Sequence, residues 1–174
     1  MLLRNLSELP ALLQKNQCLL GLDYGSKAIG VAVSDPGLCI ASPIATINRR
    51  KFADDAAALI SIIRERAIGG IVVGWPKNMN GSEGATAQAA RAFIRNLSRY
   101  TGPEGEQFNQ ELPVLFWDER LSTAAVERFL VATGMSRKRR DQVVDKAAAA
   151  YILQGALDAL KNEVLQSPQN PNHA

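Results

Sequence analysis

Acidic residues stand where the sequence predicts the ends of two strands and the start of a long helix. Asp23 ends the first strand, Asp118 and Glu119 follow the last, and Asp145 opens the final helix. Carboxylates that lie close together repel one another unless a cation lies between them. Mg²⁺ and Mn²⁺ prefer oxygen ligands, and such ions can orient a water molecule toward a phosphodiester. The pattern therefore indicates a site for Mg²⁺ or Mn²⁺, with solvated turn residues as the alternative interpretation.

The spacing does not decide which acid of the last strand joins Asp23. Side chains alternate between the two faces of a strand, so Asp118 and Glu119 point to opposite sides if the strand runs through both. Only one of them can readily lie beside Asp23. Both alternatives stay open on spacing alone.

Helical spacing predicts that Asp145 lies on the face of its helix that packs on the sheet. Asp145, Ala149 and Ile152 fall on one face of a helix, and the small residues of that face would let the helix lie close on a sheet. A carboxylate on a buried face needs a partner. Either a metal ion or the neighbouring Lys146 could serve as that partner.

The scarcity of histidine narrows the chemistry. His173 is the only histidine and lies in a polar, proline-containing tail, which argues against Ser-His-Asp hydrolysis, Cys-His chemistry and histidine-rich metal sites. Cys18 and Cys39 both have apolar neighbours, and we expect two buried free thiols. An enzyme with this composition must rely on carboxylates, lysines or hydroxyls.

Basic residues are clustered although the net charge is only +3. One cluster covers residues 49–51, and the other is Arg137, Lys138, Arg139 and Arg140. Such clusters indicate a polyanion partner or a solvated loop. The glycine-bounded loop 74–81 precedes a helix N-terminus, where a phosphate can be held. Its Lys77 and Asn78 are candidate contacts to a nucleic-acid backbone, and an ordinary strand-to-helix connection is the alternative.

The order of elements predicts an α/β fold. Apolar runs at 18–23, 29–33 and 44–47 favour an antiparallel meander with a hairpin turn at 24–27. Helical and strand patterns then alternate: helix 52–66, strand 70–74, a helix from a Ser82 cap to about 100, a loop over 101–112, strand 114–117, a helix from a Ser122 cap to about 132, and helix 142–160. This order implies a mixed five-stranded sheet flanked by helices.

The length of 174 residues fits one domain. We expect an N-terminal extension over 1–16, interrupted by Pro10, a domain over 17–162 and a disordered tail over 163–174. No apolar run is long enough to cross a bilayer, and the first residues lack the apolar core of a signal peptide. We therefore expect a cytoplasmic protein with no membrane partner.

Four stretches of the chain carry a resemblance to a known family. They are Gly21-Leu-Asp-Tyr-Gly with Ile29-Gly-Val-Ala-Val-Ser-Asp35, Val73-Gly-Trp-Pro with Asn78-Met-Asn-Gly-Ser-Glu-Gly84, Trp117-Asp-Glu-Arg-Leu-Ser-Thr123, and Ser136-Arg-Lys-Arg-Arg with Val144-Asp-Lys-Ala-Ala148. In this order and at these spacings, the chain resembles the YqgF family, also called RuvX, of Holliday junction resolvase-like proteins. The resemblance covers about residues 19–160.

The resemblance implies a ribonuclease H-like fold, as in the RuvC resolvases, and a nuclease that processes the 5′ end of precursor 16S ribosomal RNA. It implies that Asp23, Glu119 and Asp145 are the catalytic residues and the ligands of Mg²⁺ or Mn²⁺, and so it favours Glu119 over Asp118. The charge and loop patterns together with the resemblance predict nucleic-acid contacts. The residues expected to make them are Lys77, Asn78, Arg120, Arg137, Lys138, Arg139, Arg140 and Lys146.

The chain departs from the family pattern at a few positions. Ala28 stands where the family commonly has a basic residue, Trp75 and Lys77 stand where it commonly has leucines, and Asn80 replaces a common aspartate. None of these removes an expected metal ligand.

Other functions remain open at this level. The same acids could cut branched DNA such as a Holliday junction, and a non-catalytic nucleic-acid-binding transcription factor would need only the basic residues. An ATPase of the actin and sugar-kinase type has a similar glycine-containing hairpin, but it needs two such domains. We expect a monomer or a weak homodimer.

Overall fold

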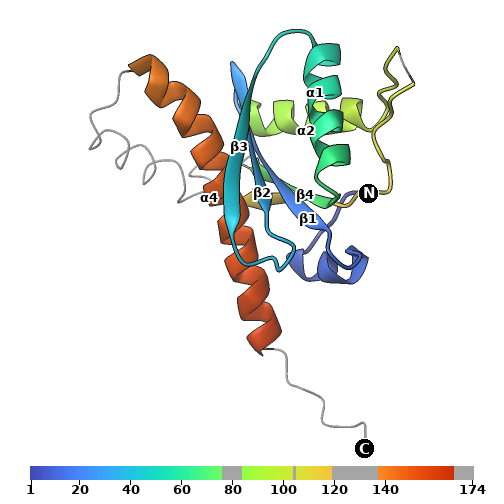
Figure 1. Cartoon of the computed structure of the whole chain (residues 1–174), viewed down its shortest axis with the longest axis vertical. Coiled ribbons are helices and arrows are strands. Elements are labelled where there is room, and N and C mark those ends of the chain that lie inside the picture. The colour runs from blue at the N-terminus through green and yellow to red at the C-terminus, as the bar shows by residue number, and fades with distance from the viewer. Residues whose placement is uncertain (76–83, 104, 119–136, 167–174) are drawn as a thin grey trace, which may run out of the picture.

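A central sheet separates two layers of helices. The computed structural model describes residues 1–75, 84–103, 105–118 and 137–166, with side chains described over 147–162 in the last range. Figure 1 shows the long helix α4 on one face of the sheet and α1 and α2 on the other. The helix expected after Ser122 lies outside the described residues.

The sheet has the mixed topology that the sequence predicts. Its strands are β1 (Cys18–Tyr24), β2 (Ala28–Ser34), β3 (Ala41–Asn48), β4 (Ile68–Trp75) and β5 (Val114–Asp118). Their order is β3-β2-β1-β4-β5. The pairs β3–β2 and β2–β1 are antiparallel, whereas β1–β4 and β4–β5 are parallel. The carboxyl ends of β1, β4 and β5 therefore meet at one edge, where the sites of α/β sheets gather.

The helices differ from the predictions mainly at their ends. Helix α1 is Phe52–Glu65, close to the expected range. Helix α2 is Ala85–Leu97, and Gly84 in extended conformation is its N-cap, so the predicted Ser82 cap is wrong. Helix α4 is Arg137–Gln166 and exceeds the predicted 142–160 at both ends. Apolar periodicity marks only the packed part of a helix, and the Arg, Lys, Glu and Gln residues beyond it are good helix formers.

Alternation along β1 divides the hydrophobic core between the two faces of the sheet. Leu20, Leu22 and Tyr24 belong to the core beneath α1 and α2, whereas Leu19 belongs to the core beneath α4. Asp23 has the same parity as Leu19, so it lies on the α4 face. The α4 side of that core is Ala149, Ile152, Leu153, Ala156, Leu157 and Leu160.

The N-terminal residues pack against the domain. The Leu3 N–H donates to the Val114 carbonyl at 2.8 Å, which places the first residues beside β5. Two 3₁₀ turns, Leu6–Glu8 and Pro10–Leu12, follow in this N-terminal extension. Leu3, Leu6 and Leu9 are buried in the α4-side core. The division of the chain at residue 16 stays a prediction.

Both cysteines are free, but the prediction that both are buried is wrong. Cys18 is half-buried and Cys39 is exposed. Cys39 lies in the β2–β3 turn, where its backbone N–H donates to the Asp35 carboxylate at 2.7 Å. Apolar neighbours in sequence therefore did not imply burial at a turn.

Helix α4 lies unusually close to β1 at Gly21. A Cβ atom at Gly21 would lie 2.7 Å from the Leu153 Cβ and 2.8 Å from the Ala149 carbonyl oxygen. These are a Cβ and a backbone atom, which cannot move aside without moving the helix. Glycine is therefore required here by the close packing of the helix on the strand.

The direction of α4 follows from a second contact. The Gln154 side chain accepts from the Ala41 N–H at 2.9 Å and donates to the Cys39 carbonyl at 3.0 Å, at the start of β3. This start lies level with Leu19, because Ala41 pairs with Ser34 and the Ser34 hydroxyl accepts from the Leu19 N–H. Helix α4 thus runs antiparallel to β1, and its residues before Ala149 lie toward the Asp23 end of the sheet.

We predict that Gly21→Ala destabilises the protein by displacing α4 from β1. Overpacking of this kind typically costs about 1–3 kcal/mol. Gly70→Ala is the matched control, because its nearest contacts are the Leu19 and Leu9 methyl groups at 2.9 and 3.0 Å, the flexible ends of side chains. Thermal unfolding should show a clearly larger loss for Gly21→Ala. Equal losses for the two variants would contradict the close-packing argument.

Candidate active site

Asp23 lies on the α4 face with a glycine on each neighbouring strand. It pairs with Gly30 of β2 and is half-buried. On the other side, Leu22 pairs with Val73, so Gly74 of β4 follows alongside Asp23. Neither neighbour carries a side chain, and this carboxylate is the only side chain that the three central strands present at this level. Other groups can approach such a carboxylate closely.

The pairing register of β5 shows on which face of the sheet Asp118 lies. Trp117 pairs with Gly74, and Asp118 pairs with Trp75. Trp117 is therefore on the face of Asp23, and it approaches α4, where its Nε1 lies 3.3 Å from an ideal Cβ at Gly155. Asp118 is on the opposite face. The structure thus rules out Asp118 as the acid beside Asp23, and Glu119 lies outside the described residues.

Helix α4 brings two further predicted groups to this end of the sheet. Asp145 lies on α4 one turn before Ala149, which packs over Gly21. The basic run 137–140 forms the first turn of the same helix. Figure 1 shows the N-terminal half of α4 rising past the sheet toward the end where β1 and β2 are joined. Lys77, Asn78 and Arg120 lie outside the described residues, and the side chain of Lys146 is likewise not described.

A metal site is only partly represented in the described part of the chain. Within that part, no three His, Cys, Asp or Glu side chains converge on a common point. The predicted ligand set needs Glu119 and the Asp145 side chain, which both lie outside the described part. The half-buried Asp23 carboxylate, between glycines, fits the oxygen ligand that Mg²⁺ and Mn²⁺ prefer.

Arg49 is a structural residue of the site that the sequence did not reveal. Its guanidinium lies 4.5 Å from the centre of the ring of Tyr24, the residue that follows Asp23 in the sequence. Its Nη1 donates to the Gly25 carbonyl at 3.2 Å and approaches that of Ser26 at 3.4 Å. Its backbone N–H donates to the Lys27 carbonyl at 2.9 Å. One side chain and its peptide group therefore hold the whole turn that leaves Asp23.

The counter-charge of Arg49 comes from α1. The Asp55 carboxylate is buried, lies 3.9 Å from the Arg49 Nε and accepts from the Arg50 N–H at 3.2 Å. Burial raises the pKa of the Tyr24 phenol, while the Arg49 charge acts in the opposite direction. A sequence signal existed, because Asp55 shares the apolar face of α1 with Leu59 and a buried acid needs a partner.

The end of β4 is also fixed by stacking. Trp75 is buried, and its ring packs edge-on against Phe116 with centroids 4.5 Å apart. The Arg91 guanidinium of α2 lies 4.6 Å from the Trp75 ring centre. This explains why an aromatic residue is accommodated where the family pattern commonly has leucine. It also anchors the point where the chain leaves for residues 76–83.

No helix among the described residues combines the length and the hydrophobicity that a bilayer crossing requires.

Comparisons with known proteins agree with this architecture. The family model described as RuvX, Holliday junction resolvase, matches residues 17–159. A protein of Rhodospirillum centenum is 54% identical over 161 residues, covering 92% of this chain and 84% of the relative. A protein of Ruegeria pomeroyi is 51% identical over 162 residues, covering 93% and 99%. Both bear the name "Putative pre-16S rRNA nuclease".

A solved structure supports the same fold. The RuvC of T. thermophilus in complex with a Holliday junction substrate aligns with a TM-score of 0.51 and 15% identity, covering 84% of this chain and 96% of that chain. At this identity the likeness concerns the fold, which is ribonuclease H-like, as the sequence resemblance implied. With the family model matched over most of its length and relatives about half identical, the chain belongs to the RuvX family.

Proposed function

We propose that this protein is a metal-dependent nuclease that hydrolyses phosphodiester bonds and processes the 5′ end of precursor 16S ribosomal RNA. The observation that carries the proposal is the place of Asp23: a half-buried carboxylate at the carboxyl end of β1, between Gly30 and Gly74, on the face crossed by α4. The name of the half-identical relatives supplies the substrate class.

Asp23, Glu119 and Asp145 are the proposed catalytic residues and the ligands of Mg²⁺ or Mn²⁺. A bound ion of this kind supplies positive charge for the phosphodiester oxygens and lowers the pKa of a water molecule. The alternation of β5 supports Glu119, because Asp118 lies on the wrong face and the next residue of a continuing strand would share the face of Asp23. The direction of α4 supports Asp145.

The chain's other residues bind and orient the substrate in this proposal. The glycines on the two strands beside Asp23 add no side chain next to the carboxylate, which leaves space for a phosphate to approach it. The basic first turn of α4 holds a backbone phosphate near it. Further phosphate contacts are proposed for Lys77, Asn78, Arg120 and Lys146. Arg120 has a second candidate role, the orientation of Glu119.

A cytoplasmic location and a monomeric or weakly dimeric state belong to the same proposal. Precursor ribosomal RNA is made in the bacterial cytoplasm, which supports the location. Cleavage of branched DNA is the competing activity, because the family model is described as a Holliday junction resolvase. Both substrates therefore enter the test.

We predict that Asp23→Asn abolishes metal-dependent cleavage and leaves the fold intact. Loss of an outer-shell partner of a metal ligand costs about 10- to 100-fold, so loss of a ligand should cost more than about 100-fold in rate. The measurement is cleavage of end-labelled precursor 16S RNA and of a four-way DNA junction with Mg²⁺, Mn²⁺ or EDTA. Circular dichroism and thermal unfolding check the fold.

Asp118→Asn is the matched control for this variant. It makes the same chemical change on the opposite face of the sheet, so cleavage should remain near the wild-type level. Retained cleavage in Asp23→Asn would refute the assignment of Asp23. Cutting of the junction alone would move the activity to DNA resolution. Binding without cutting of either substrate would favour a non-catalytic nucleic-acid-binding factor.

We predict that neutralising the basic first turn of α4 weakens substrate binding more than it slows the chemical step. The variant replaces Arg137, Lys138, Arg139 and Arg140 by Ala. KM for precursor RNA should rise, and the rise should shrink as salt concentration increases, because screening removes the same interaction in the wild type. Replacement of the three arginines by lysine keeps the charge and should restore most of the affinity. An unchanged KM in the alanine variant would show that this turn does not contact the substrate.

A further inference from the structure

The β1–β2 hairpin and the loop between β3 and α1 form one rigid unit. The Arg49 N–H donates to the Lys27 carbonyl, and the Arg49 guanidinium donates to the Gly25 carbonyl and stacks on Tyr24. Asp55 then ties this arginine to the first turn of α1. The contacts of Arg49 with the hairpin join residues that are more than twenty positions apart in sequence, and the backbone on both sides is thereby fixed.

Of the four cationic side chains in this unit, one is engaged in contacts within the protein and three are exposed to solvent. Arg49 is engaged in the contacts described above, and its counter-ion Asp55 is buried. Lys27, Arg50 and Lys51 are exposed. Asp54 is the one exposed acid among residues 24–28 and 49–55. We call Lys27, Arg50 and Lys51 the hairpin patch. Its net charge is positive, and its charged ends face water.

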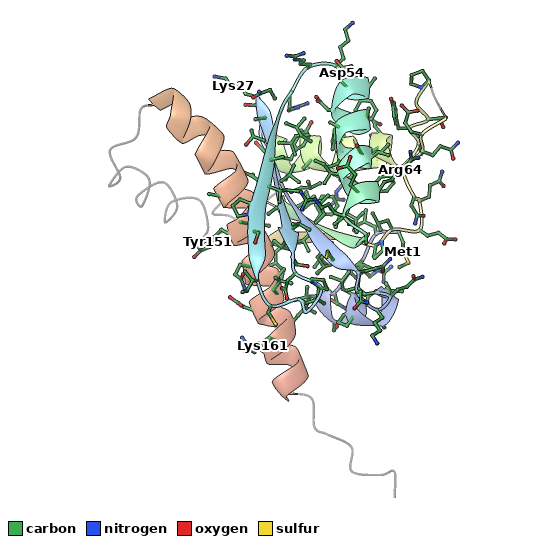
Figure 2. The ribbon with its side chains drawn as sticks, in the orientation of Figure 1. Met1, Lys27, Asp54, Arg64, Tyr151 and Lys161 are labelled. Atoms are coloured by element: carbon green, nitrogen blue, oxygen red, sulfur yellow. The ribbon has the colours of Figure 1, made fainter. Side chains whose placement is uncertain are left out.

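The hairpin patch lies at the same end of the molecule as Asp23. Lys27 is four residues beyond Asp23, so at a rise of about 3.3 Å per residue its backbone lies no more than about 13 Å away. Figure 2 places Lys27 and Asp54 at one end of the molecule and Lys161 at the other. The Arg49 N–H bond to the Lys27 carbonyl places Arg50 beside Lys27, so the patch lies where a strand held at Asp23 would leave this end of the sheet.

We infer that the hairpin patch is a phosphate-binding surface for the RNA that the proposed function places at Asp23. Three exposed cations on a backbone fixed by the Arg49 and Asp55 contacts attract the phosphates of a nucleic-acid backbone. Because the backbone of the patch is already ordered, binding does not have to order it, which lowers the entropic cost. The partner is an RNA backbone flanking the bond to be cut, recognised by charge and not by base sequence. This inference rests on the proposed function.

The test compares two triple variants that lose the same charge. Lys27→Ala, Arg50→Ala and Lys51→Ala remove the hairpin patch. Arg4→Ala, Lys15→Ala and Lys161→Ala remove three exposed cations elsewhere on the surface. Both triples are made in the Asp23→Asn background, so that binding is measured without cleavage. The measurement is the affinity for a precursor 16S RNA fragment and for a four-way DNA junction over a series of KCl concentrations, with thermal unfolding as the check on folding.

We expect the hairpin-patch variant to lose about 2 units from the slope of log K against log salt, since each phosphate contact to a single strand contributes about 0.7. The control triple should keep the parent slope. A parallel loss on the junction would support a general phosphate contact. Equal slopes for the two triples, a loss on the junction alone, or a parent that binds no RNA would overturn the inference.

Failure of the proposed function can be distinguished from failure of the phosphate-binding surface. If the wild type cuts neither substrate while the hairpin-patch variant shows the reduced slope on RNA, the surface stands and the nuclease assignment falls. If the wild type cuts RNA and the patch variant binds like the control, the nuclease assignment stands and the surface falls.

Discussion

The close approach of α4 to β1 at Gly21 is the contact on which the rest of the structure depends. A helix normally keeps the distance that side chains on both surfaces dictate. Here one partner contributes no side chain and the other contributes Ala149 and Leu153, so backbone and Cβ atoms nearly touch. This contact fixes the height of α4 above the sheet, and the Gln154 bonds to the start of β3 fix its direction. Together they determine which residues of α4 lie near Asp23.

Glycines have a second role on the same face, beside Asp23, which lies two residues after Gly21 on β1. Gly30 and Gly74 flank Asp23, so the two neighbouring strands add no side chain directly beside it. The close packing at Gly21 and the glycine-flanked position of Asp23 thus follow each other along one strand. Stability and access are obtained from the same residue type, used once to bring a helix near and once to keep side chains away.

Much of the fold was predictable because its elements carry clear periodic patterns. The meander, the doubly buried β4 and the alternation of helices all follow from apolar spacing. The family resemblance selected Glu119 for the predicted ligand set, a choice that spacing left open, and the register of β5 independently removed Asp118. The role of Arg49 could not be predicted, because its contacts depend on a turn more than twenty residues away and its sequence neighbours, Arg50 and Lys51, are solvated. The helix ends and the exposure of Cys39 were missed because local propensity and turn geometry, not apolar pattern, decide them.

The Arg49–Asp55 pair has a consequence for how this sequence can change over time. Replacing either partner alone leaves a largely buried charge without its counter-charge, which is strongly unfavourable, whereas replacing both by neutral groups of similar volume can be tolerated. Positions 49 and 55 are therefore expected to covary among related chains, as a charged pair or as an apolar pair. The neighbouring Arg50 and Lys51 face solvent and are not bound by this pairing; in the proposed phosphate-binding role, only their positive charge has to be kept. Within one short basic run, position 49 would then be constrained by its pairing with position 55, and positions 50 and 51 would not.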